Sequence, residues 1–358
     1  MSERAPEPPP TEPGPPSPAA VVAMTKTPSA RWRWIKRVAR VVLFVLGVSA
    51  VVLLVRSAGP ELVLATVLEA GPWLPLIIVL ECCFMGMDAV ALRGLLGEHG
   101  KRVPFAVWVR TAMLQYGVMQ LLPAGRAGGE IARAAGLSPH IGGAARAAAA
   151  ATRLQAATML ANTLISIPCY IAVAFADSAH SALGYAVLVN ALGTAAIGTV
   201  LILTVRRSKF GGWLGKRIPF LEAHGPVFDE ELRHGTPWTP AIVATTIGRS
   251  FQALQYGLIL LAVGGTLTLT SALVAQGIHL VGAGMGDLVP NQVGITEGAY
   301  TLFAPALGLE GQIAKAIGIA LVARICQFSL AGLSLTVTAV WKPGAEAPSS
   351  ERASAIPQ

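Results

Sequence analysis

Charged residues are scarce in this sequence. Only 13% of its 358 residues are Asp, Glu, Lys or Arg, whereas 53% are hydrophobic. Soluble domains carry about 25% charged residues, so the composition argues against a soluble domain and favours a polytopic membrane protein. The net charge of +8 comes mostly from basic residues that flank apolar runs, as cytoplasmic anchoring charges do. A nucleic-acid partner is therefore not expected.

Residues that bind metals or nucleotides are also few. The four cysteines form no C-x-x-C pair, and the six histidines show no ligand spacing, so neither a zinc site nor a disulfide framework is indicated. No G-x-x-x-x-G-K-[ST] loop occurs, and ATP hydrolysis within this chain is not expected. We therefore expect no cofactor and no enzyme activity.

The two ends of the chain lack apolar runs. Residues 1–30 are rich in proline between Pro6 and Pro18, which predicts a disordered leader. Residues 342–358 are predicted to form a disordered tail. Residues 31–341 between them are predicted to form one transmembrane domain. Basic residues precede its first apolar run, which places the N-terminus in the cytoplasm.

Long apolar runs supply the membrane spans, since a spanning helix needs about 20 mostly apolar residues. Such runs occupy Val38–Arg56, Trp73–Leu92, Arg146–Ala176, Leu183–Val205, Thr239–Val263 and Gln312–Trp341. Two further stretches, Pro104–Leu137 and Leu269–Leu309, are interrupted by a central proline and several glycines. If the basic loops lie in the cytoplasm, each broken stretch must enter and leave from one face or cross twice.

The two broken stretches would then approach the bilayer midplane from opposite faces. This arrangement is typical of transporters built from inverted-topology repeats. We therefore predict an all-α fold: a polytopic transmembrane helical bundle with two proline- and glycine-broken re-entrant segments in an inverted-repeat arrangement. Broken backbone at membrane depth is tolerated only where it is buried in protein or faces water.

The first break, Leu121–Glu130, reads LLPAGRAGGE. Proline favours the first turn of a helix, so a half-helix is expected after it. Arg126, Glu130 and Arg133 are spaced by four and three residues and share one helical face. Two guanidinium groups held by one carboxylate would form a cationic cradle for a phosphate. The alternative is an interfacial charge cluster without a ligand.

The second break, Leu288–Gly298, reads LVPNQVGITEG. Glu297 and Asp287 lie at membrane depth, where carboxylates need partners, so they are expected to pair with arginines or exchange protons. Thr296 is expected to cap a helix that begins at Glu297. The alternative is that Glu297 only satisfies backbone amides freed by the break.

Three arginines in or near the spans could provide those partners. They are Arg153, Arg249 and Arg324, and an arginine inside a span is costly unless it is paired. Arg324 lies deepest, whereas Arg153 and Arg249 could merely anchor membrane ends. Glu81 and Asp88, seven residues apart, share a face of the second span. The candidate substrate-binding residues are Arg126, Glu130, Arg133, Arg153, Arg249, Asp287, Glu297 and Arg324.

With these motifs the chain resembles the membrane domain of lysylphosphatidylglycerol synthases, which is also found alone as a flippase-like integral-membrane family. The resemblance extends from about Trp73 to Trp341. It rests on a proline–glycine break that ends in an acidic residue with an arginine three residues later, a second break ending in a glutamate, and arginines in the following helices. The matching positions here are Glu130, Arg133, Arg153, Glu297 and Arg324.

One position departs from the family pattern, because Thr296 stands where the family often has an arginine. The resemblance implies translocation of an anionic phospholipid or a polyprenyl-phosphate-linked lipid, and it does not imply lysyl transfer. Two alternatives stay open: a membrane enzyme acting on a lipid phosphate, and a non-catalytic partner of a glycosyltransferase or lipid-modifying enzyme. The G-x-x-x-G motifs permit a homodimer. The expected location is the cell membrane, with both termini in the cytoplasm.

Overall fold

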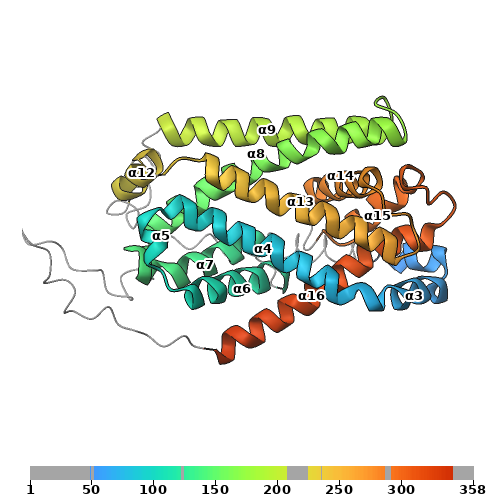
Figure 1. Cartoon of the computed structure of the whole chain (residues 1–358), viewed down its shortest axis with the longest axis horizontal. Coiled ribbons are helices and arrows are strands. Elements are labelled where there is room, and N and C mark those ends of the chain that lie inside the picture. Colours follow the sequence, from blue (N-terminus) through green and yellow to red (C-terminus); the bar gives the residue numbers. More distant parts are fainter. Residues whose placement is uncertain are drawn as a thin grey trace, which may run out of the picture.

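A computed structural model describes residue 49 and residues 52–121, 125–207, 225–234, 236–286 and 292–341. No strand occurs in that part of the chain, which confirms the predicted all-α class (Figure 1). The predicted leader and tail, and most of the expected span Val38–Arg56, lie outside the described residues. The elements are α3 (Pro60–Glu69), η1 (Gly71–Trp73), α4 (Leu74–Leu96), α5 (Glu98–Arg102), α6 (Phe105–Leu121), α7 (Gly125–Ile141), α8 (Ala144–Ala176), α9 (Ala182–Arg207), α12 (Gly225–His234), α13 (Thr239–Ala262), α14 (Leu269–Gly286), α15 (Ile295–Leu302), η3 (Ala304–Leu307) and α16 (Ile313–Val340).

Four helical segments of the described chain are long and apolar enough to cross a membrane: Pro60–Leu96, Ala144–Ala176, Ala182–Thr204 and Ile313–Val340. α13 has 24 residues but is not among them, because Arg249, Gln252 and Gln255 lower its hydropathy. These three side chains are buried. α13 therefore turns its polar residues toward the interior of the bundle, whereas α9, at the edge beside α8, is mostly exposed and apolar.

The first broken stretch folds as an antiparallel helical hairpin of α6 and α7. A β-carbon placed on Gly129 would lie 2.6 Å from the carbonyl oxygen of Gln115, and one on Gly136 would lie 2.7 Å from Thr111. Later residues of α7 therefore contact earlier residues of α6, as in an antiparallel pair. Each helix has 17 residues, which span about 25 Å at 1.5 Å per residue. That length is less than the roughly 30 Å hydrocarbon core.

The second broken stretch forms a similar hairpin of α14 and α15. Gly282 of α14 faces Ala299 of α15, and the Tyr300 hydroxyl donates to the Ala275 carbonyl oxygen over 2.9 Å. The two helices are therefore antiparallel as well. α15 has only eight residues. It continues into η3 before α16 begins.

The two hairpins open toward opposite ends of α4. α4 and α13 pack antiparallel, since Gln255 donates to the Ile77 carbonyl and Thr236 to the Gly94 carbonyl. The first hairpin follows α5 at the C-terminal end of α4, and α7 packs against α5. The second hairpin follows the last turn of α13, which packs beside η1 at the other end of α4. Figure 1 shows the two hairpins in opposite halves of the bundle.

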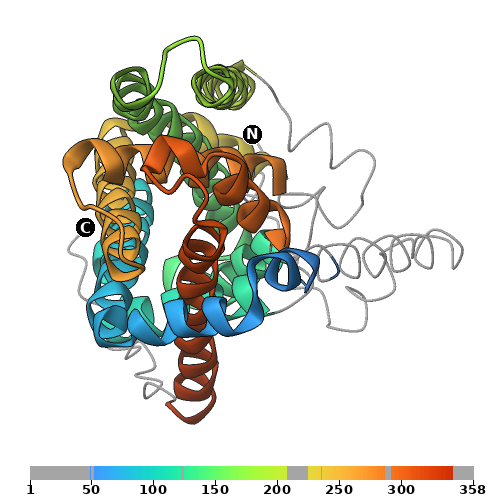
Figure 2. The same ribbon diagram turned by 90° about the vertical axis from the view of Figure 1, so that its right-hand side faces the viewer.

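Each hairpin packs against the long helix that follows the other hairpin. α6 contacts α16, and α14 contacts α8. At the first of these contacts, a β-carbon on Gly117 would lie 2.7 Å from the Leu335 side chain. The view along the bundle in Figure 2 shows α16 opposite the α8–α9 pair. The two halves are therefore interlocked rather than placed side by side.

The close packing of α7 on α6 gives a testable consequence. Gly129→Ala is expected to destabilise the protein by about 1–3 kcal/mol, because the added methyl group meets the backbone of α6 and forces a shift. Gly298→Ala in α15 is the matched control, since a β-carbon there has no neighbour within 4 Å. Thermal unfolding in detergent measures both. Equal stability of the two variants would contradict the close hairpin contact.

Candidate functional site

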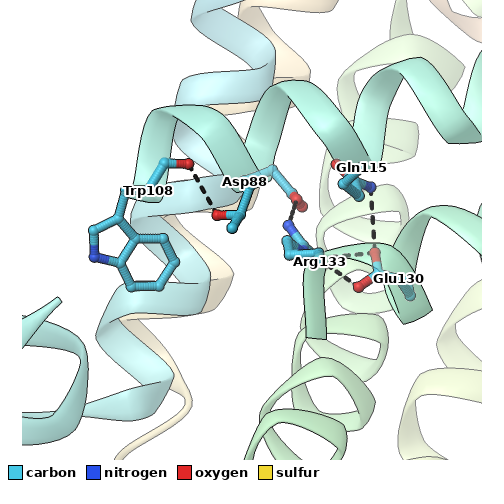
Figure 3. Close-up of polar contacts among 6 residues, drawn as sticks. Asp88, Trp108, Gln115, Glu130 and Arg133 are labelled. Atoms are coloured by element: carbon cyan, nitrogen blue, oxygen red, sulfur yellow. Dashed lines mark hydrogen bonds and ion pairs between the residues drawn. The ribbon is translucent and has the colours of Figure 1, made fainter. Parts of the chain in front are cut away.

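The first hairpin carries a buried ion cluster centred on Arg133 (Figure 3). Its guanidinium group lies 2.6 Å from Asp88 of α4 and 2.7 Å from Glu130 of α7, and its side chain is 3% exposed. The Gln115 side chain of α6 donates to Glu130 over 3.3 Å. One cation thus faces two carboxylates, so Arg133 is already neutralised by the protein and the cluster carries an excess negative charge.

A small polar cavity of about 50 Å³ lies beside this cluster. It is bounded by five helices, α4, α6, α7, α8 and α13, and two carboxylates and a guanidinium group are in its lining. A polar space of this size can hold ordered water. Its polar lining residues are Asp88, Gln115, Tyr116, Glu130, Gln155, Thr158, Thr245 and Arg249.

Arg249 is the cation in the lining of this cavity. It is 6% exposed and lies 5.0 Å from the centre of the Phe84 ring, in cation–π geometry. Its Nη1 donates to the Gln252 side-chain oxygen over 2.7 Å, and that oxygen also accepts from Gln276 of α14 over 3.1 Å. A chain of polar side chains therefore leads from the cavity toward the second hairpin.

The second hairpin is closed by Glu297, which is fully buried. One carboxylate oxygen lies 2.8 Å from a terminal nitrogen of Arg324 in α16, and the other accepts from the Gly294 backbone amide over 2.9 Å. For Glu297 the sequence predicted two alternative roles, pairing with an arginine or accepting from a backbone amide, and in the structure it does both. Gly294 has a φ of 84°, a conformation that favours glycine.

Of the other predictions for this hairpin, the one for Thr296 is wrong and the one for Asp287 lies outside the described residues. Thr296 does not cap the helix, because α15 begins at Ile295, two residues before the expected start at Glu297, and its N-cap is Gly294. The hydroxyl would have to precede the first turn to accept from its amides. Asp287, the other expected carboxylate, lies outside the described residues, as does the side chain of Arg126.

Arg153 is placed away from the cavity. Its guanidinium group donates to the backbone carbonyl oxygens of Leu95 and Thr236 and lies 5.1 Å from the centre of the Trp238 ring. These contacts join α8 to the C-terminal end of α4 and to the segment before α13. In this position Arg153 stabilises a helix end, where free carbonyl groups attract cations.

The site also contains residues that the sequence marked only weakly or not at all. Asp88 is the second partner of Arg133, and Glu81 accepts hydrogen bonds from Tyr116 and Gln255, each over 2.7 Å. The seven-residue spacing of Glu81 and Asp88 was the available signal for the two acids. No spacing rule linked the glutamines, which come from α6, α8, α13 and α14.

Comparison with known proteins identifies the family of the chain. The family model described as Lysylphosphatidylglycerol synthase TM region matches residues 37–334. No curated protein and no solved structure matches the chain. The family match covers most of the 358 residues and confirms the resemblance drawn from the two breaks.

Proposed function

We propose that this protein, which belongs to the lysylphosphatidylglycerol synthase TM region family, moves a phosphate-bearing lipid across the bilayer. Family membership and the four long apolar helices identify an integral, multi-pass membrane protein. The lipid is an anionic phospholipid or a polyprenyl-phosphate-linked lipid, and the protein acts as a transporter rather than an enzyme. The polar cavity between the first hairpin and α13 carries this proposal.

The arrangement of the two hairpins supports a transport function. Each hairpin comes from a sequence stretch that contains proline and glycine. The two hairpins open toward opposite ends of α4, and each packs on the long helix that follows the other. We propose that they are re-entrant and related as inverted repeats. In proteins built this way, substrate sites lie near the bilayer midplane between the repeats, and the repeats move against each other.

The charges of the site suggest a division of tasks. Arg133 is bound by two carboxylates, so we assign it to holding α7 on α4 rather than to the ligand. Arg249 lines the cavity and is our candidate phosphate ligand there. We propose that Glu130 and Asp88 orient Arg133. We also propose that Arg324, which Glu297 holds in the second half of the protein, binds the lipid phosphate after Arg249.

The charge distribution at one end suggests how the protein sits in the membrane. The first hairpin opens beside α5, which carries Lys101 and Arg102. Cytoplasmic ends of membrane proteins are enriched in such residues. We propose that this end faces the cytoplasm together with both termini, and that the cell membrane is the location.

Lipid movement in proteoliposomes tests the function. Purified protein would be reconstituted with fluorescent phosphatidylglycerol, and exchange between leaflets would be followed by dithionite quenching beside a phosphatidylcholine probe. Faster movement of the anionic probe than in protein-free vesicles is the expected result. No movement above those vesicles would contradict transport and would favour a membrane enzyme or a partner of another enzyme.

Variants of Arg249 test whether this residue binds the lipid phosphate. Arg249→Gln is expected to slow movement of the anionic probe at least about tenfold, since charge-assisted contacts to phosphate contribute roughly 1.5–3 kcal/mol. Arg249→Lys keeps the charge and is expected to lose less. Lys101→Gln, an exposed cation on α5, is the matched control. Equal rates for all three variants would remove Arg249 from the path.

A further inference from the structure

Glu81 is a buried carboxyl group that the proposed phosphate path does not use. Its side chain lies in α4 and is 2% exposed. One oxygen accepts from the Tyr116 hydroxyl and the other from the Gln255 amide, each over 2.7 Å. Both partners are neutral, and no ion pair joins Glu81 to a cation within the described chain. A buried carboxylate without an adjacent cation is costly, and such a group commonly holds a proton instead.

The surroundings of Glu81 contain one nearby cation, Arg249 of α13. The other buried pair, Arg324 with Glu297, joins α16 to α15. Asp88 is two turns along α4 and is bound to Arg133. The other titratable groups that interact with Glu81 are Cys82 of α4, Tyr116 of α6, Tyr256 of α13 and Cys326 of α16.

A short path connects Glu81 to the polar cavity. Tyr116 lines the cavity and is hydrogen-bonded to the Glu81 carboxyl group. Its hydroxyl proton can pass to Glu81 while the phenol oxygen takes a proton from a hydronium ion that enters the cavity, which leaves a water molecule there. The cavity then loses one proton, Glu81 gains one, and Tyr116 is neutral before and after.

We propose that Glu81 is a proton-binding site that is coupled to phosphate binding at Arg249. When Glu81 is ionised, its negative charge partly balances Arg249 and opposes an incoming anion. When Glu81 carries a proton, that opposition is removed and the phosphate binds more tightly. Because coupling between two sites is reciprocal, phosphate binding at Arg249 favours protonation of Glu81. The proton site follows from the geometry alone, whereas the coupling rests on the proposed function.

The coupling is tested by the pH dependence of lipid movement. Movement of fluorescent phosphatidylglycerol by the wild-type protein is expected to rise about fivefold or more between about pH 8 and about pH 5, within the usual range of coupling energies. Glu81→Gln resembles the protonated state and is expected to give a fast, pH-independent rate. Glu98→Gln, which changes an exposed carboxylate on α5, is expected to keep the wild-type profile. A wild-type profile in Glu81→Gln would overturn the coupling.

A second variant covers the case in which Glu81→Gln does not fold. Tyr116→Phe removes one donor to the ionised carboxylate, so the midpoint of the pH profile is expected to move upward by about one unit. An unchanged midpoint would overturn the proposal. Purely structural loss would lower the rate at every pH without moving the midpoint.

A readout without lipid separates this proposal from the transport function. Infrared difference spectra between acidic and alkaline buffer are expected to show the C=O band of a protonated carboxyl group in the wild-type protein. The band should be lost in Glu81→Gln and kept in Glu98→Gln. If lipid does not move but the band behaves in this way, transport is refuted and the proton site stands. A band that persists in Glu81→Gln would overturn the proton site.

Discussion

Arg133→Met is expected to destabilise the protein by about 3–5 kcal/mol, as the loss of one member of a buried ion pair does. The substitution removes the buried cation between Asp88 and Glu130 and leaves two partly buried carboxylates that repel each other. The contact between α4 and α7 through Arg133 would be lost, so the first hairpin is expected to pack less tightly on α4, while its contacts with α8 and α16 remain. Thermal unfolding in detergent and lipid movement in proteoliposomes measure the effect, and movement is expected to fall to the background of empty vesicles.

Two further variants distinguish charge from geometry at this position. Arg133→Lys keeps the charge but cannot bridge two carboxylates with a planar fork, so partial loss of stability is expected. Arg102→Met removes an exposed cation on α5 and is expected to behave as the wild-type protein. If Arg133→Met were as stable as Arg102→Met, the buried cluster would contribute nothing to the fold.

Glu297→Ala is expected to have the second large effect, a loss of about 4 kcal/mol. The carboxylate holds Arg324 and also accepts from the Gly294 amide. Breaking the buried pair costs about 3 kcal/mol at the lower end of its range, and removing a helix cap costs about 1 kcal/mol. Glu297→Gln retains an acceptor for the amide and is expected to recover the capping part only.

The double variant Glu297→Gln with Arg324→Gln tests whether the two side chains act as a pair. Its stability is expected to exceed the value calculated from adding the two single losses, by about 1–3 kcal/mol, since contacting residues are not additive. Glu310→Gln, an exposed carboxylate after the hairpin, is the control. Strict additivity of the two single variants would show that the ion pair contributes no coupling energy.

The helices could be predicted from the sequence because their signal is local. Apolar length marked α4, α8, α9, α13 and α16 to within a few residues of their ends. The two broken stretches were also recognisable, since proline and glycine interrupt helices in known ways. Which helices pack against which could not be predicted, because all of them present similar apolar faces and their charges are too few to order them.

Those parts of the site that depend on local spacing could also be predicted from the sequence. Glu130 with Arg133 is a local pair on one helix. The rule that a carboxylate at membrane depth needs a partner predicted an arginine for Glu297 and left three candidates, of which the structure brings Arg324 to it. The sequence placed Asp88 only on a shared face with Glu81, yet Asp88 completes the Arg133 cluster from 45 positions away in sequence. Its role depends on how α4 and α7 approach each other, which no spacing within a single helix encodes.

The contact between α6 and α16 has a consequence for how the chain is made. α6 ends at Leu121 and α16 begins at Ile313, so more than half of the chain is synthesised after α6 and before α16. Until α16 emerges from the ribosome, Gly117 and Tyr116 have no partner at the positions later filled by Leu335 and Leu330. Contacts of such high sequence separation form late, and domains in which they dominate expose apolar surface during synthesis. The first hairpin of the chain therefore cannot complete its packing until the last helix is in the membrane.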